Sequence, residues 1–271
     1  MSGQRAGNAA NTILLSVEDA VAVVTLNRPE SMNALVDDMR ERLGGALREA
    51  AGRDDVRVIT LTGSGRAFCA GADVQVMAKL VESGDEDTFA RYLRAGMEVI
   101  REMRRAEKPV IAALNGPAAG AGAALALACD LRAASERASL GITFNRVGLH
   151  PDWGATYFLP RLVGYGRAAE LVFSGRMVPA GEARQIGLVD RLYPQVDFRK
   201  RSGELAVSLA RTAPLAFREA KRTLAGDPAG LDQAMEREAE AQMLCFRSPE
   251  FREGVAAFLD KRPADFARVG T

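Results

Sequence analysis

An uncharged stretch between Pro109 and Cys129 limits what this chain can fold into more than any other part of its sequence. The stretch is long enough to cross a membrane as one helix. Turn-forming residues interrupt it, however, in the segment NGPAAGAG from Asn115 to Gly122. A buried strand, a tight turn and a helix of small residues produce the same run. We therefore predict that arrangement at 109–129, and no membrane span.

Apolar residues recur elsewhere with the periods of strands and helices. Further strands are predicted at 13–17, 21–26, 56–62 and 130–134, the first two as a hairpin. Helices are predicted along the stripe Leu35, Met39, Leu43 and Leu47, at 88–106 and 122–128, and through most of the chain after Pro179. Strand–helix alternation of this kind is typical of an α/β spiral with mostly buried strands. We predict a core domain at 1–198 and a C-terminal helical region at 199–271.

The charges of the chain nearly balance, with 36 Lys and Arg against 35 Asp and Glu and a net charge of +1. A nucleic-acid-binding surface normally needs a basic excess, so we expect no nucleic-acid partner. The cysteines Cys69, Cys129 and Cys245 lie far apart in the sequence, so we expect no metal site. Their sparse, odd number and the polar N-terminus MSGQRAGNAANT favour a cytoplasmic protein without a secretory signal.

Several common catalytic and cofactor motifs are missing from the sequence. There is no G-x-x-x-x-G-K-[ST] phosphate loop, and neither Gly120-Ala-Gly122 nor Gly63-Ser-Gly65 completes the dinucleotide pattern G-x-G-x-x-G. The one histidine, His150, has no serine in a G-x-S-x-G elbow to act with. We therefore expect no bound cofactor and no serine-hydrolase triad.

Two glycine-rich segments stand out: GRAFCAGADVQVM at 65–77 and NGPAAGAGAALALACD at 115–130. Each follows a predicted strand and precedes a predicted helix, where backbone N–H groups lack partners. Two such groups aimed at one point form an oxyanion hole, and small residues would let a thioester approach the backbone. Tight packing of the turns would require the same glycines, and both interpretations stay open on physical grounds.

Four motifs occur in one order along the chain: LNRPESMNAL, AFCAGAD, KPVIAALNGPAAGAG and FLPRLVG…GLVD. In sequence and spacing the chain resembles the enoyl-CoA hydratase/isomerase (crotonase) superfamily from about Val21 to its C-terminal part. The resemblance implies a crotonase-like spiral of ββα repeats, a C-terminal helical trimerisation region and an acyl-CoA substrate. It also implies a homotrimer or dimer of trimers, and an oxyanion hole formed by the N–H groups of Ala70 and Ala121.

The resemblance further implies which residues contact the ligand. Those matched to coenzyme A contacts are Arg28, Asn33, Ala34, Leu35, Ala72, Asp73 and Val74. Lys261 would reach the coenzyme A of a neighbouring subunit. Phe144 and Trp153 would shape the acyl pocket.

The catalytic carboxylates of hydratases fall, by the same resemblance, on Ala124 and Phe144, neither of which can move a proton. Adding water to a double bond needs a base and an acid. Asp152 matches the place where several isomerases of the superfamily carry a functional acid. We therefore favour an enoyl-CoA isomerase with Asp152 as base, in a site dried by Phe144; His150, two residues away, could serve structure or catalysis.

Three alternatives remain open at this point. The chain could be an enoyl-CoA hydratase or lyase of the same superfamily with an atypical acid and base. It could be an aryl-CoA dehalogenase with Asp152 as nucleophile, but the helix before Lys108 lacks the histidine that such an enzyme uses. It could also be a non-catalytic member that only binds coenzyme A.

Overall fold

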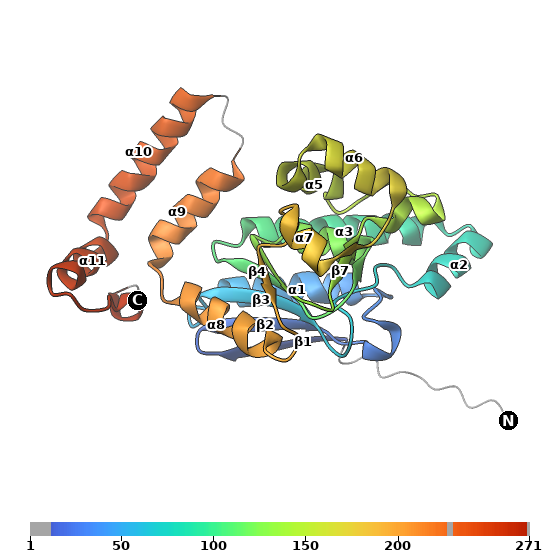
Figure 1. The fold of residues 1–271 in the computed structure, drawn as a ribbon, viewed down its shortest axis with the longest axis horizontal. Helices are drawn as coiled ribbons and strands as arrows, with labels where there is room; N and C mark the ends of the chain where they lie inside the picture. Colours follow the sequence, from blue (N-terminus) through green and yellow to red (C-terminus); the bar gives the residue numbers. More distant parts are fainter. Residues whose placement is uncertain (1–11, 227–229, 270–271) are drawn as a thin grey trace.

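A six-stranded sheet forms the centre of the molecule in the computed structural model, which describes residues 12–226 and 230–269 (Figure 1). The strand order is β1-β2-β3-β4-β6-β9, and all neighbours are parallel except β1 and β2. The strands are β1 (Ile13–Glu18), β2 (Val21–Leu26), β3 (Val58–Gly63), β4 (Val110–Leu114), β6 (Leu131–Ser135) and β9 (Arg191–Tyr193).

The predicted strands and hairpin are confirmed, with boundaries shifted by one or two residues. Asp19 and Ala20 close the hairpin with positive φ angles of 49° and 61°. Strand β9 was not predicted, because it is only three residues long and joins the sheet through the backbone of β6. The prediction about a secretory signal concerns residues 1–11, which lie outside the described residues.

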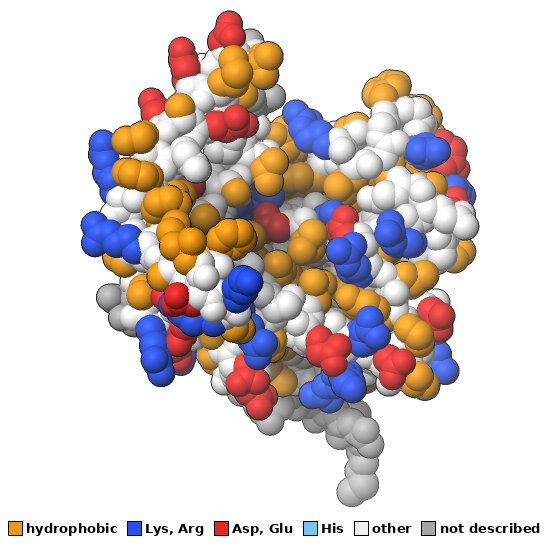
Figure 2. All heavy atoms as spheres, turned by 60° about the vertical axis from the view of Figure 1, so that its left-hand side comes forward, with side chains coloured by type: hydrophobic (Ala, Val, Ile, Leu, Met, Phe, Trp, Pro, Cys, Tyr) orange, Lys and Arg blue, Asp and Glu red, His pale blue; other side chains and the backbone are white. Residues whose placement is uncertain are grey.

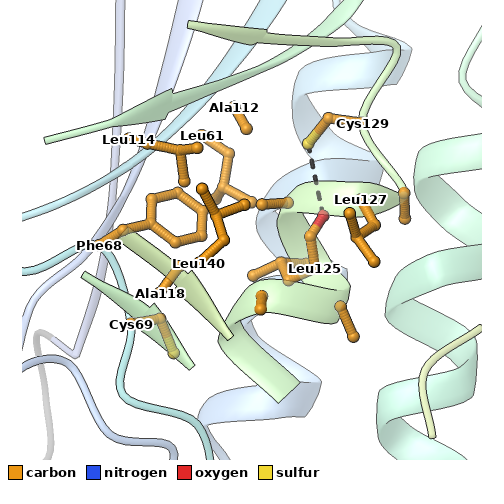
Figure 3. Close-up of a cluster of buried hydrophobic side chains, with 14 of the residues drawn as sticks. Leu61, Phe68, Cys69, Ala112, Leu114, Ala118, Leu125, Leu127, Cys129 and Leu140 are labelled. Carbon is orange, nitrogen blue, oxygen red and sulfur yellow. Dashed lines mark hydrogen bonds between the residues drawn. The ribbon is translucent and has the colours of Figure 1, made fainter. Parts of the chain in front are cut away.

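The uncharged stretch folds as predicted, into strand β4, a turn with β5 (Ala118–Ala119), and helix α4 (Ala121–Leu127). Every residue of α4 is buried. Leucines of α4 pack in one apolar cluster with residues of β3, β4 and β7 (Figure 3). This burial explains the lack of charge, because an ionised side chain there would lose its hydration without a partner. Among the described residues, no helix is both long and apolar enough to span a bilayer.

Two helices cover one face of the sheet and pack against each other: α1 (Met39–Gly52) and α3 (Glu86–Arg105). The predicted stripe is correct for Met39, Leu43 and Leu47, which are all buried. It is wrong for Leu35, which precedes the helix and forms an isolated parallel bridge with Ala72. A spacing of four residues cannot reveal this, because an extended residue just before a helix can be buried equally well.

A smaller sheet and several short helices complete the core. The sheet has the order β5-β7-β8, with β7 at Ser139–Gly141 and β8 at Val178–Pro179. The remaining helices of the core are η2 (Pro29–Ser31), α2 (Val74–Ser83), η3 (Thr143–Val147), α5 (Ala155–Val163), α6 (Tyr165–Ser174) and α7 (Ala180–Gln185). This region bears out the predicted α/β architecture, including strand–strand–helix units.

The C-terminal part is helical, as predicted, and begins with α8 (Phe198–Ala210). Ala206 of α8 packs on the sheet against Val58 and Ile111, so this helix still belongs to the core. The helices that extend away from the sheet are α9 (Pro214–Ala225), α10 (Leu231–Arg247), α11 (Pro249–Leu259) and α12 (Phe266–Val269) (Figure 1). Ser248 caps α11 as its residue type suggests, accepting a hydrogen bond from the N–H of Phe251. The division at residue 199 stays a prediction.

The extended helices leave apolar side chains exposed. Figure 2 shows such side chains along these helices, beside a hollow in the surface. The large exposed ones include Leu244, Phe246, Phe251, Phe258 and Leu259. A hollow of about 760 Å³ lies between α9, α11 and the edge of the core near Arg53 and Lys108.

Candidate active site

The first glycine-rich turn follows β3 and is held in place by one buried side chain. Asn33 is fully buried, and its Nδ2 donates to the carbonyl oxygens of Ser64, Ala67 and Phe68 at 2.9, 2.8 and 3.2 Å. Its Oδ1 accepts the N–H of Arg28 at 2.9 Å. The amide therefore satisfies backbone groups that no strand or helix could pair.

The second glycine-rich turn is tied to the first by Asn115. Its Oδ1 accepts the N–H of Gly63 at 3.1 Å, and its Nδ2 donates to the oxygens of Gly65 and Ala67 at 3.1 and 3.0 Å. Backbone hydrogen bonds continue the contact, from Ala119 N to Cys69 O at 2.9 Å, for example. Two segments that are about fifty residues apart thus form one rigid unit.

The open N–H groups of this unit differ in part from the predicted ones. Ala70 donates its N–H to the oxygen of Met32 at 2.9 Å, which contradicts the prediction that this group is free for a ligand. In contrast, the N–H groups of Ala72 and Ala121 donate to no acceptor within the described chain. Ala121 is the first residue of α4, where a helix leaves its N–H groups unpaired.

Gly71 brings these two open N–H groups close to each other. A Cβ atom on Gly71 would lie 2.8 Å from Ala119 O and 3.4 Å from Ala121 N, and the glycine has a φ of +91°. Both the close approach and the positive φ favour glycine here. Ala72 and Ala121 are therefore better candidates for the two donors of an oxyanion hole than Ala70 and Ala121, because the N–H of Ala70 is already used. That they bind one oxygen atom together is a hypothesis.

The residues predicted to contact coenzyme A surround the first turn, but they are not equally accessible. Asn33, Ala34 and Leu35 are buried. Arg28 is partly exposed; its Nη1 donates to Ala34 O at 2.6 Å and to Asp73 Oδ2 at 3.2 Å. The carboxylate of Asp73 also caps α2 by accepting the N–H of Gln75 at 3.0 Å.

Val74, the first residue of α2, is 71% exposed. Arg28, Ala72 and Val74 are thus open to a ligand at this turn, whereas the side chains of Asn33 and Leu35 support it from inside. That coenzyme A binds here stays a prediction.

Asp152 lies between η3 and α5 in surroundings that suit a base. Its Oδ1 atom is buried and has no hydrogen-bond partner. Burial raises the pKa of Asp152 from 3.8 to about 6, and the charges of Arg40 and His150 limit the rise. Desolvation destabilises the ionised form, so the carboxylate binds a proton more readily than an exposed one.

The two positions that the resemblance gives to hydratase glutamates are apolar and buried. Ala124 lies inside α4 and is fully buried. Phe144 lies in η3 and is also buried. Neither position provides a group that accepts or donates a proton.

Trp153 is buried and fills a space left open by a glycine of α3. A Cβ atom on Gly96 would lie 2.0 Å from the indole Nε1 atom, so the ring lies directly against the helix backbone. Trp153 has a φ of 50°, which is uncommon for a bulky residue. Packing of the indole against α3 therefore fixes the loop that carries Asp152, while the neighbouring His150 is exposed.

Sequence reasoning missed two residues near Asp152, namely Arg40 of α1 and Tyr92 of α3. Arg40 is only 4% exposed, and its guanidinium lies 4.4 Å from the centre of the Tyr92 ring. Its Nη1 atom is buried without a hydrogen-bond partner. One feature of the sequence could have indicated that Arg40 is buried: it follows Met39 and precedes Leu43 by three residues, at the margin of the apolar stripe.

Two further predictions concern more distant features. Lys261 follows α11, on the opposite side of the molecule from α2, so one chain does not bring it to the first turn (Figure 1). That it reaches a neighbouring subunit's ligand stays a prediction. No cluster of three potential metal-ligating side chains occurs within 12–226 and 230–269. The expected absence of metal and cofactor also stays a prediction.

Open backbone N–H groups at two adjoining turns, together with a partly buried carboxylate on the same spiral of α/β units, suit a class of proteins that stabilise an oxyanion. Comparison with known proteins specifies the class further: the family model for enoyl-CoA hydratase/isomerase matches residues 16–268. The chain belongs to this enoyl-CoA hydratase/isomerase family.

Individual relatives agree with this assignment. A Rhodobacter capsulatus protein named "Probable enoyl-CoA hydratase" is 42% identical, covering 94% of this chain and 98% of that protein. The 1,2-epoxyphenylacetyl-CoA isomerase of Escherichia coli is 35% identical, covering 94% and 97%. The crystal structure of an enoyl-CoA hydratase from Bacillus anthracis superposes with a TM-score of 0.88 at 34% identity, covering 93% and 98%.

Proposed function

We propose that this protein is an enoyl-CoA isomerase, which moves a double bond along the acyl chain of a coenzyme A thioester. The proposal rests on which of three positions carries a carboxylate. Asp152 is a partly buried carboxylate with a raised pKa, whereas Ala124 and Phe144 are apolar. Moving one proton needs one base, but adding water needs both an activated water and an acid.

The first step of the proposed reaction uses the two open backbone N–H groups. The thioester oxygen accepts hydrogen bonds from Ala72 and Ala121, and Asp152 removes a proton from the α-carbon of a 3-enoyl-CoA. The C–H electron pair forms a double bond from the α-carbon to the carbonyl carbon, the carbonyl π pair moves to the oxygen, and this oxygen carries the negative charge of the resulting enolate. Preorganised N–H groups stabilise that charge without reorganisation of solvent.

The second step returns the same proton. Protonated Asp152 delivers it to the γ-carbon, the double bond takes the conjugated 2-position, and the thioester carbonyl forms again. No atom is gained or lost. The apolar ring of Phe144 favours this shift, because a dry site limits attack of water on the conjugated product.

Assembly through the C-terminal helices belongs to the same proposal. Phe258 and Leu259 at the end of α11 are 83% and 73% exposed. Apolar side chains in such number on protruding helices are typical of surfaces that another chain covers. We expect a homotrimer or a dimer of trimers, in which Lys261 approaches the coenzyme A site of a neighbour.

The decisive experiment compares the wild type with Asp152→Asn on a 3-enoyl-CoA, following the absorbance of the conjugated 2-enoyl product. The amide cannot accept the α-proton, so the rate should fall roughly a thousandfold. Affinity for a saturated acyl-CoA should change little, because the oxyanion donors are on other segments. His150→Ala is the matched control: it changes an exposed neighbour and should leave most of the activity.

Equal rates for wild type and Asp152→Asn would rule out Asp152 as the base.

The relatives named as hydratases favour a second candidate function, that of a hydratase with an atypical acid and base. It would be supported by hydration of crotonyl-CoA at rates of ordinary enzymes, on the order of 10 per second. Binding without turnover of any enoyl-CoA would instead indicate a non-catalytic member.

A further inference from the structure

Arg40 carries a buried positive charge that the protein itself leaves unpaired. The side chain is 4% exposed, and the buried Nη1 atom has no hydrogen-bond partner. An arginine keeps its charge under all ordinary conditions, so the cost of burial is not removed by loss of a proton. Leaving such a charge without an acceptor is strongly destabilising.

The neighbours of Arg40 place its charge within the proposed acyl site. Four groups lie near enough to interact with it electrostatically: Tyr92 of α3, Glu41 of α1, Asp152 of the loop before α5, and Cys69 of the first glycine-rich turn. None of them forms an ion pair with Arg40. Arg40 therefore lies near Asp152 and near the first glycine-rich turn, which carries Ala72. The ring of Tyr92, 4.4 Å from the guanidinium, fixes the orientation of the group.

Asp152 does not supply the missing partner. Arg40 and Asp152 attract each other, yet they form no ion pair, and Asp152 Oδ1 is itself buried without a hydrogen bond. Direct pairing would hold the pKa of Asp152 low, whereas that pKa is raised. Arg40 Nη1 and Asp152 Oδ1 thus each lack, within the described residues, a hydrogen-bond partner that a ligand could provide.

We propose that the acyl group of the substrate carries a second carboxylate, which Arg40 binds, so that the substrate is a coenzyme A thioester of a dicarboxylic acid. This inference rests on the proposed acyl-CoA site. The planar guanidinium offers parallel N–H groups that match a carboxylate in two-point contact. Binding would pair the buried charge. A coenzyme A thioester whose acyl chain ends in a methyl group would leave the charge of Arg40 unpaired.

The test is calorimetric titration with pairs of saturated acyl-CoA thioesters that differ only at the chain end. Suitable pairs are succinyl- and butyryl-CoA, glutaryl- and pentanoyl-CoA, adipyl- and hexanoyl-CoA, and suberyl- and octanoyl-CoA. The length of the series covers the unknown reach from thioester to Arg40. In at least one pair the wild type should bind the carboxylated ligand roughly a hundredfold more tightly, as expected for a buried charge pair.

Arg40→Met should abolish this preference and improve binding of the methyl-ended ligand. The variant should fold, because an apolar side chain replaces an unpaired buried charge, and thermal unfolding will check this. Arg91→Met is the matched control: Arg91 also lies over Tyr92, at 5.0 Å, but it is exposed and paired with Glu41. It should keep the preference of the wild type.

The result that would overturn the inference is a wild type without preference in any pair, or a preference that survives in Arg40→Met. If Arg40 only adjusts the charge of Asp152, Arg40→Met would move the pH profile of isomerisation without changing ligand choice, which also overturns it. Because the ligands are saturated, the binding result does not depend on isomerase activity. A carboxylate preference without turnover of 3-enoyl-CoA would overturn the proposed function alone.

Discussion

The glycine-rich turns and the surroundings of Asp152 use their polar groups in opposite ways. In the turns, Asn33 and Asn115 bond fully to backbone atoms, and the chain is fixed in one conformation. Around Asp152, the atoms Arg40 Nη1 and Asp152 Oδ1 are buried and have no hydrogen-bond partner in the described part of the chain. The satisfied groups support the structure, and at the unsatisfied Arg40 and Asp152 we expect a ligand to complete the hydrogen bonding.

The open N–H groups of the turns share one property with each set: they belong to the fixed turns, but they make no hydrogen bond. Ala72 and Ala121 belong to the rigid unit, yet their N–H groups are unused. A rigid donor without a partner is preorganised for an oxyanion, since no hydrogen bond within the protein must break first. The contrast between supporting and functional polar groups leads to three tests beyond those given with the proposals.

Ala121→Pro should have the largest effect, on turnover. Proline removes the open N–H but fits the first position of a helix, so α4 should still form. Loss of one oxyanion donor should lower the isomerisation rate roughly a hundredfold to a thousandfold. Ala121→Gly keeps the N–H and should retain the activity. Circular dichroism checks the fold; a Pro variant that folds and turns over normally would exclude this donor.

Asn33→Ala should destabilise the fold without a direct effect on chemistry. The carbonyl oxygens of Ser64 and Phe68 would lose this donor, while Ala67 O would keep Asn115, so the free energy of unfolding should fall by about 2 to 3 kcal/mol. Asn145→Ala is the control, because Asn145 is exposed and donates a single hydrogen bond, to Phe173 O at 2.7 Å. It should cost about 1 kcal/mol or less. Denaturant titration measures both, and equal losses would refute the supporting role of Asn33.

Asp152→Asn should show a small, pH-dependent gain in stability. The folded-state pKa of Asp152, about 6, exceeds its ordinary value of 3.8, so ionisation destabilises the folded wild type as the pH rises from 4 to 6. The variant has no such loss and should be more stable by about 1 to 2 kcal/mol above pH 6, after allowance for partial exposure. Below pH 4 the two should converge.

Isomerase activity should depend on the same ionisation, but it should rise with pH through about 6, because only the ionised carboxylate is a base.

Asp85→Asn provides the control for the stability measurement on Asp152→Asn. The pKa of Asp85 is lowered by its hydrogen bond to the Thr88 N–H, so the wild type should lose that contribution as the pH falls. A stability difference for Asp152→Asn that does not vary between pH 4 and 6 would show that its carboxylate is not destabilised by burial.

Much of the site could be predicted because its parts are continuous in sequence. The second turn, from strand to glycines to helix, lies within 109–129, and the local chemistry of Gly120 and Ala121 requires no distant information. Asp152 was likewise identified from a motif. The error at Ala70 has a different origin, because its N–H is taken by Met32, which is far away in the sequence. Motif position alone cannot show which of several N–H groups in a turn is used.

The sequence by itself determined the strand–turn–helix order and the buried character of α4. These follow from residue type and spacing, which act locally. Only the tertiary structure decided that Asn33 is a support, that Ala72 has an open N–H, and that Arg40 and Asp152 lie near each other without pairing. Burial and hydrogen bonding depend on segments that meet only on folding, so no single segment of the chain contains them.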